Sequence, residues 1–385
     1  MTDYDLVIIG AGIHGAAIAR AASYDDYKVC IVEQYHQPGL ATSSRSSKLI
    51  HGGLRYLESY QFKLVRECLH ERAVLLKIAS SLVKLIPFYI PVYKNNKRPP
   101  WLIFAGLFIY RLLGGGHFKK IPKSEWSSLD GLDTEQLQAV FQYHDAQTDD
   151  QKLTQAVLNN AINQGANFKS DCEFISADLS SNNLQINLKD HEPVSAKILI
   201  NASGPWVNNV LKKINPSQKT LPIDLIQGTH IVIPRTLSKG IYYVEAADRR
   251  VVFAIPWKQH CLIGTTETAF NDKPENTHPL PEEITYLLST WNHYFNDKLT
   301  ADDVLESFAG LRVLPGSDGS AFSRSRDTIL HTDNNDNPKI ISIYGGKLTA
   351  HRATAEAVMK IIHQQLPGHK KTDTTTLKLE SQNLK

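Results

Sequence analysis

The chain has 385 residues, 42% of them hydrophobic and 21% charged, which is typical of a globular protein long enough for two or three domains. The net charge of +3 is too small to indicate a nucleic-acid-binding protein, and the sequence contains no long basic run. The four cysteines are scattered and form no C-x-x-C pair, which argues against a metal site or a disulfide framework.

The N-terminal residues predict a strand, a helix and a second strand. Residues 5–9 are an apolar run expected to form a buried strand, residues 16–22 are strong helix formers, and residues 29–32 are again apolar. The residues before the first strand lack a basic region. We therefore expect no signal peptide and a cytoplasmic location.

A G-x-G-x-x-G sequence, formed by Gly10, Gly12 and Gly15, connects the first strand to the helix. In a dinucleotide-binding unit the first glycine permits the tight turn, the second lets the backbone approach a pyrophosphate, and the third lets the helix pack on the strand. Glu33 ends the second strand, near the position where an acid binds a ribose hydroxyl. The combination predicts a dinucleotide site and is compatible with either NAD or FAD.

A hydroxyl-rich segment, residues 42–48, follows the second strand. It is either a solvated loop or a second anion cradle that offers hydroxyl and backbone donors to a phosphate or a flavin ring. The adjacent glycines Gly52 and Gly53 imply close approach of the backbone to a flat or bulky group. Arg55 and Tyr56 lie beside this site, and arginine is suited to bidentate binding of a carboxylate or phosphate.

Two segments in the first half of the chain predict helices. The spacing of apolar residues predicts a long helix over residues 60–84, followed by an extended segment over 87–91. Residues 101–113 are apolar, flanked by cations, and shorter than the roughly 20 apolar residues that span a bilayer. We favour a buried helix here, with a helix lying in the membrane interface as the alternative.

The second half of the chain predicts further strands. A strand over residues 194–202 runs into a turn at Gly204, which suggests a second contact with the adenosine half of the cofactor. Residues 221–268 contain several short strands and predict an antiparallel sheet in a substrate domain. An apolar strand over 340–344 leads through paired glycines into a final helix, whose N-terminus suits an anion or a polar ring edge. The polar tail, residues 372–385, is expected to be poorly ordered.

The chain resembles the FAD-dependent glycerol-3-phosphate dehydrogenases, respiratory enzymes of the glycine/D-amino-acid oxidase fold group. The resemblance rests on S-S-K-L-I-H-G-G-L-R-Y-L at residues 46–57 and on six further motifs in the family's order: N-A-S-G-P-W (201–206), G-T-H-I-V-I-P (228–234), I-G-T-T (263–266), G-L-R-V-L (310–314), S-R-D (325–327) and G-G-K-L-T (345–349). Two residues depart from the pattern: Glu267 stands where the family usually has Asp, and Ser203 where it usually has Thr. The family's further C-terminal helical domain is expected to be lacking, which makes this a short form.

The resemblance implies an α/β fold. The expected architecture is a Rossmann-like FAD-binding domain of the glycine/D-amino-acid oxidase type with an inserted α+β substrate domain built on an antiparallel sheet. We assign residues 1–86, 151–220 and 309–385 to the FAD-binding domain, and residues 87–150 and 221–308 to the substrate-binding domain.

The resemblance also implies an activity: oxidation of sn-glycerol 3-phosphate to dihydroxyacetone phosphate, by hydride transfer from C2 to N5 of a noncovalently bound FAD. A quinone or another acceptor would then take the electrons. We further expect a homodimer, no metal and no nucleic acid, with residues 101–113 as the candidate for peripheral contact with the inner face of the cytoplasmic membrane. Two alternatives stay open: an amine or 2-hydroxy-acid oxidase of the same fold, and a catalytically silent flavin-binding protein.

Residue roles follow from the same resemblance. The expected catalytic residues are His230 as the general base, because a neutral imidazole accepts a proton at pH 7, with Arg312 and Lys347. Arg312 and Arg55 are the expected anchors of the phosphate dianion. The substrate-binding candidates are Arg55, Tyr56, Thr266 and Arg326. The cofactor-binding candidates are Gly10, Gly12, Gly15, Glu33, Thr42, Ser43, Ser47, Lys48, Leu49, His51, Gly204, Gly346, Lys347, Leu348 and Thr349.

Overall fold

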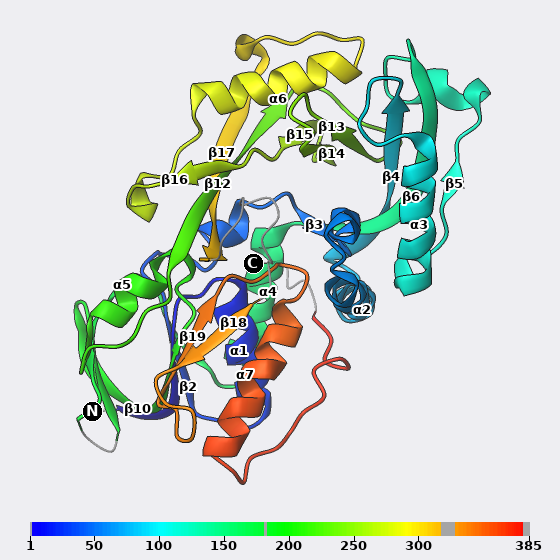
Figure 1. Cartoon of the computed structure of the whole chain (residues 1–385). Helices are drawn as coiled ribbons and strands as arrows, with labels where there is room; N and C mark the ends of the chain where they lie inside the picture. The colour runs from blue at the N-terminus through cyan, green and yellow to red at the C-terminus, as the bar shows by residue number, and fades with distance from the viewer. Residues whose placement is uncertain (1, 181–182, 317–327, 380–385) are drawn as a thin grey trace.

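The computed structural model describes residues 2–180, 183–316 and 328–379, and two sheets organise this part of the chain (Figure 1). The first sheet contains β1 (Thr2–Ile9), β2 (Val29–Val32), β7 (Asn167–Lys169), β8 (Phe174–Asp178), β9 (Leu184–Leu188), β10 (His191–Asn201), β11 (Ile214–Asn215), β18 (Ile329–Thr332) and β19 (Ile340–Tyr344). The second contains β3 (Leu49–Ile50), β4 (Val83–Tyr93), β5 (Lys119–Lys120), β6 (Leu137–Thr148), β12 (Ile223–Ile233), β13 (Ile241–Glu245), β14 (Val251–Trp257), β15 (His260–Gly264), β16 (Thr268–Phe270) and β17 (Glu306–Pro315). The helices are α1 (Ile13–Tyr24), α2 (Phe62–Ile78), α3 (Pro100–Tyr110), α4 (Asp150–Asn163), α5 (Val207–Lys212), α6 (Pro281–Tyr294) and α7 (His351–Gln365).

The centre of the first sheet is parallel. β1 lies between β10 and β2, β2 continues to β7, and β19 pairs with β10, all in parallel register. Leu6 and Ile8 pack toward α1, α4 and α7, whereas Val7 and Ile9 pack on the opposite face with β8, β9 and α5. Burial on both faces explains why residues 6–9 of β1 form a continuous apolar run.

The second sheet is antiparallel except where β13 runs parallel to β4. β17 pairs with β12 along nearly its whole length, from Ile223 opposite Pro315 to Val232 opposite Glu306. The apolar side of α6, including Leu287 and Trp291, packs on this sheet, and Figure 1 shows α6 lying across it. The antiparallel sheet expected over residues 221–268 is confirmed, and β4 and β6 extend it.

The division of the chain into two domains stays a prediction. The second sheet takes strands from both segments assigned to the substrate domain, and also includes β3 and β17. The predicted boundary at residue 309 lies inside β17, which spans Glu306–Pro315.

The helix expected over residues 60–84 is shorter than predicted. α2 ends at Ile78, and Val83 already begins β4, which pairs with β6 over its full length. Apolar residues at the start of β4 fit a helical repeat as well as a strand. The predicted helix therefore extended beyond the true end of α2. The extended segment over residues 87–91 is confirmed as part of β4.

The expectation that residues 101–113 are buried is wrong for most of α3. Ile103, Leu107 and Tyr110 are buried, but Trp101 is 70% exposed, Phe104 52% and Phe108 48%. The helix therefore presents a broad apolar surface outward. Within the described residues, none of the helices combines the length and the apolar character needed to cross a membrane.

Residues 372–379 of the tail are held by hydrogen bonds, contrary to expectation, and residues 380–385 lie outside the described part of the chain. The Thr372 N–H donates to Asp25 Oδ1 at 2.7 Å, an Arg20 guanidinium N–H donates to the Leu377 carbonyl at 2.7 Å, and the Leu379 N–H donates to the Ile78 carbonyl at 2.6 Å. These partners come from α1 and α2, so a local reading of the polar tail does not reveal them.

Candidate active site

A cavity of about 710 Å³ is lined by residues of both sheets. The contributing segments are the β1–α1 turn, the stretch from the end of β2 to Tyr56, the turn after β10, parts of β12 and β17, and the turn after β19. The carboxyl ends of the parallel strands β1, β2, β10 and β19 therefore meet at one place, where open α/β sheets bind ligands.

The glycine turn has the geometry expected of a pyrophosphate site. Gly10 has φ +96°, which favours glycine, and a Cβ on Gly15 would lie 1.9 Å from the Gly10 carbonyl oxygen. α1 begins directly after Gly12, with no acidic residue in its first turn. Glu33 accepts a hydrogen bond from the Ala11 N–H at 2.7 Å, and burial raises the pKa of its carboxyl group. Gly10, Gly12 and Glu33 line the cavity, whereas Gly15 acts in packing α1.

The hydroxyl-rich segment folds against the glycine turn and β17. Ser43 Oγ accepts a hydrogen bond from the Ile13 N–H at 3.0 Å, and Thr42 Oγ1 donates to the Leu311 carbonyl at 2.9 Å. Both residues line the cavity, as do Ser47, Leu49 and His51. Lys48 does not: its ammonium group donates to the buried Asp150 carboxylate at 2.5 Å. The side chain is thus held in a buried ion pair, and the cofactor role of Lys48 stays a prediction.

The turn after β19 brings a cationic side chain into the cavity. Gly346 has φ +109°, and a Cβ there would lie 2.2 Å from His14 Nε2. Lys347 Nζ is buried, lies 4.6 Å from the centre of the Tyr56 ring, and has no hydrogen-bond partner among the described residues. Thr349 Oγ1 accepts a hydrogen bond from the His51 N–H at 3.2 Å. This contact joins the turn after β19 to the sequence motif at residues 46–57. Gly204, Leu348 and Thr349 also line the cavity.

Two arginines that line the cavity converge on one carboxylate. Arg312 lies 2.8 Å and Arg55 3.6 Å from Glu267 Oε1. Arg312 also donates to Thr265 Oγ1 at 3.1 Å. Arg55, Tyr56, Thr265 and Arg312 line the cavity. A carboxylate between two guanidinium groups holds them in position and partly neutralises their charge.

His230 is buried beside these groups. Its Nε2 lies 2.9 Å from Ser47 Oγ, its ring stacks on Phe308 at 5.1 Å between centroids, and a Cβ on Gly264 would lie 2.0 Å from its ring. Burial, reinforced by the positive charges of Lys48 and Arg312, holds the pKa of His230 well below its usual value. The imidazole is therefore neutral at pH 7.

One predicted substrate contact, Thr266, is not brought into the cavity. Thr266 is 2% exposed, and its hydroxyl donates to Glu283 Oε1 at 2.7 Å, away from the cavity. Its neighbour Thr265 lines the cavity instead, which the sequence did not reveal because a loop after a strand gives no clear indication of which side chain turns inward. Arg326 lies outside the described residues.

The residues present fit a flavin dinucleotide. The glycine turn and the start of α1 offer backbone N–H groups to a pyrophosphate. Lys347 Nζ and His14 Nδ1 are buried polar atoms without a hydrogen-bond partner among the described residues, and a bound group would supply one. Fold and site together define a flavin-dependent oxidoreductase.

Comparisons with known proteins agree with the assignment to the flavin-dependent oxidoreductases. Residues 5–352 match the family model described as FAD dependent oxidoreductase (DAO), and the chain belongs to this family, with FAD as its cofactor. A glycerol-3-phosphate dehydrogenase from Pseudomonas aeruginosa is 37% identical over 367 residues, which cover 92% of this chain and 71% of the relative. A D-erythritol 1-phosphate dehydrogenase from Brucella abortus is 35% identical over 380 residues, covering 94% of this chain and 75% of the relative.

A solved structure is similar to this chain over nearly its whole length. The glycerol-3-phosphate dehydrogenase from Bacillus halodurans, complexed with FAD, superposes with a TM-score of 0.76 and 27% identity, covering 98% of this chain and 68% of that chain. The expected fold, with an FAD-binding Rossmann-like part and an antiparallel sheet, is confirmed, and so is the expected cofactor. The roles of individual site residues stay predictions.

Proposed function

We propose that this protein oxidises the C2 alcohol of sn-glycerol 3-phosphate to dihydroxyacetone phosphate. The observation that carries the proposal is that Arg55 and Arg312, which converge on Glu267, line the same cavity as His230. A phosphate dianion needs cationic anchors, and paired guanidinium groups bind it bidentately. The names of the relatives from P. aeruginosa and B. halodurans support the same substrate.

Each residue has a defined task in this reaction. Arg55 and Arg312 bind the phosphate and so orient the carbon chain of the substrate. His230, which is neutral before substrate binds, accepts the proton of the C2 hydroxyl, and the negative charge of the bound phosphate favours its protonated form. The bound FAD supplies the oxidising group, which accepts the C2 hydride. Lys347 places a positive charge where negative charge develops.

A second candidate substrate is D-erythritol 1-phosphate, which the name of the B. abortus relative favours. Both substrates carry a secondary alcohol and a phosphate ester. The deciding experiment compares kcat/KM for sn-glycerol 3-phosphate, D-erythritol 1-phosphate, glycerol, lactate and glycine with an artificial electron acceptor. A preference for sn-glycerol 3-phosphate supports the proposal, a preference for the erythritol ester replaces its substrate, and turnover of lactate or glycine alone contradicts it.

We further propose that a quinone accepts the electrons from the reduced cofactor.

We also propose that α3 contacts an anionic lipid bilayer. Trp101, Phe104 and Phe108 are exposed on α3, and Leu112 directly after it is 70% exposed. Exposed cations flank α3 in the sequence: Lys94 and Lys97 precede it, and Arg111, Lys119 and Lys120 follow it. An apolar helix of this length with cationic flanks suits the interface of a negatively charged membrane. The homodimer stays a prediction.

Vesicle co-sedimentation tests this contact. Wild-type protein is expected to bind vesicles containing anionic phospholipid more strongly than neutral vesicles. A Trp101→Glu/Phe108→Glu double variant should lose that binding, whereas Leu305→Glu, at an apolar residue 54% exposed elsewhere, should retain it. Equal binding by all three proteins, or none by the wild type, contradicts the membrane contact.

A further inference from the structure

Glu283 is a buried carboxylate outside the cavity that collects hydrogen bonds from three segments. It is 3% exposed and belongs to the first turn of α6. Its Oε1 accepts from the hydroxyls of Thr266 and Thr268, both at 2.7 Å. Its Oε2 accepts from Gln227 Nε2 at 2.7 Å and Thr229 Oγ1 at 2.5 Å. Burial acts to raise the pKa of this carboxyl group, but the hydrogen bonds outweigh it and the pKa lies below its usual value.

The residues next to these donors face the cavity. Thr229 immediately precedes His230 on β12, and successive side chains of a strand point to opposite faces. Thr266 lies between Thr265 and Glu267, both of which contact Arg312. The carboxylate thus fixes one side of the same backbone whose other side carries the site.

Backbone contacts tie the two segments together at the same point. Thr266 Oγ1 accepts a hydrogen bond from the Thr229 N–H at 2.8 Å while donating to Glu283. An Arg312 guanidinium N–H donates to the Thr266 carbonyl at 3.1 Å. A shift of Thr266 would therefore move an acceptor that Arg312 uses directly.

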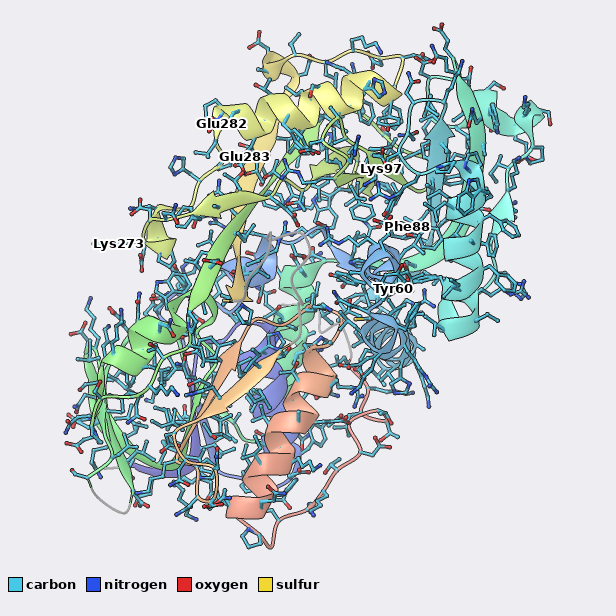
Figure 2. All side chains as sticks on the ribbon, viewed as in Figure 1. Tyr60, Phe88, Lys97, Lys273, Glu282 and Glu283 are labelled. Carbon is cyan, nitrogen blue, oxygen red and sulfur yellow. The ribbon has the colours of Figure 1, made fainter. Side chains whose placement is uncertain are left out.

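We propose that Glu283 is a positioning residue that holds β12 and the loop after β15 in register, and so sets the position of Arg312 for an anionic ligand. The proposal rests on the proposed function in taking a phosphate group as that ligand. Figure 2 shows Glu282 and Glu283 side by side at the beginning of α6, at the end of the helix near β12 and β17.

The charge of the carboxylate is required, because each of its oxygens accepts from two side-chain donors. In Glu283→Gln one of the oxygens becomes an amide NH₂, which itself donates. Whichever way the amide is turned, two former donors face another donor. The substitution therefore removes charge-assisted hydrogen bonds to a buried acceptor. Losing them corresponds to a change of about tenfold or more in an equilibrium constant, here the Kd for phosphate.

The test measures binding of inorganic phosphate to the FAD-loaded protein by titration calorimetry. Glu283→Gln is expected to retain the FAD absorbance spectrum and to bind phosphate about tenfold more weakly or worse. Glu282→Gln is the matched control, since Glu282 is the exposed neighbour on α6, and it should bind phosphate as the wild type does. A merely structural role would lower the yield of loaded protein but leave the phosphate Kd of the folded fraction unchanged, and that result overturns the proposal.

A second pair of variants covers failure of Glu283→Gln to fold. Thr266→Val removes the hydroxyl that bridges Glu283 and β12 and should weaken phosphate binding, whereas Thr266→Ser restores the hydroxyl and should recover most of it. Equal phosphate binding by the valine and serine variants overturns the proposal. Flavin reduction by sn-glycerol 3-phosphate is measured in parallel: if it fails in the wild type while phosphate binds and the Glu283 effect is present, the proposed function alone is contradicted.

Discussion

Ser47 Oγ lies 2.9 Å from Nε2 of His230, although the two residues are 183 positions apart in the sequence. The contact joins the hydroxyl-rich segment to β12 and fixes the orientation of the imidazole in the cavity. A serine predicted to bind the cofactor thus contacts the candidate general base. The two roles are compatible, because Ser47 also lines the cavity.

His230→Gln should slow flavin reduction by sn-glycerol 3-phosphate by about 10²- to 10⁴-fold while FAD stays bound, because the proton acceptor is lost. Ser47→Ala should slow the same reduction about tenfold, since the imidazole is still present but loses a hydrogen bond that orients it. Anaerobic stopped-flow absorbance measures both rates. Normal reduction in His230→Gln would assign the base to another residue.

Arg312→Ala should lower kcat/KM for sn-glycerol 3-phosphate by about 2–4 kcal/mol of transition-state stabilisation, because a cationic anchor of the phosphate is removed. With unphosphorylated glycerol the same variant should lose little, since there is no phosphate to bind. Arg66→Ala, at an exposed arginine of α2, is the control and should behave as the wild type. Equal losses with both substrates would mean that Arg312 does not act on the phosphate.

Gly15→Ala should abolish FAD binding. A Cβ at this position would lie 1.9 Å from the Gly10 carbonyl oxygen, so α1 must move away from the glycine turn. Gly106→Ala is the matched control: a Cβ there meets nothing within 4 Å, and alanine is favoured over glycine within a helix such as α3 by up to about 1 kcal/mol. FAD content after purification and thermal unfolding report both outcomes. A Gly15→Ala protein with a full complement of FAD would contradict the close packing of α1.

The stability of the fold should fall as pH is lowered below about 6.5, in part because of buried histidines. Burial lowers the pKa of His351 to about 3 and that of His14 to about 4, so both stay neutral in the folded protein where the unfolded chain takes up protons. Each contributes a loss of about 1.4 kcal/mol of unfolding free energy per pH unit below its unfolded pKa.

His351→Gln isolates one of these contributions, because glutamine does not titrate. Between pH 6 and pH 4.5 its unfolding free energy should fall less steeply than that of the wild type, by about 1.4 kcal/mol per pH unit. Denaturant unfolding at a series of pH values gives both slopes. Identical slopes would show that His351 is protonated in the folded protein.

The sequence predicted well those features that local pattern determines. The strand, glycine turn, helix and second strand at the N-terminus depend on consecutive residues, and β2 has the predicted limits, Val29–Val32. The strand β19, which leads into paired glycines, was predicted for the same reason. Motif strings also identified the family, because several of them retain their order along the chain.

The rest depends on contacts between distant segments. The apolar pattern of α3 predicts burial, but whether a neighbouring element covers Trp101 is decided by the tertiary structure. The ion pair of Lys48 with Asp150, 102 positions away, could not be predicted from the local sequence. Thr265 and Thr266 are adjacent and chemically identical, and only the direction of the backbone after β15 decides which one faces the cavity.

The most direct test of the proposed function is an anaerobic titration of the purified, FAD-loaded protein with sn-glycerol 3-phosphate, followed through the visible absorbance of oxidised flavin. We predict complete bleaching by the phosphate ester, and far less bleaching by glycerol or lactate at the same concentrations. A flavin band that sn-glycerol 3-phosphate leaves unchanged, while an amine or a 2-hydroxy acid bleaches it, would contradict the assignment of a polyol phosphate as the substrate.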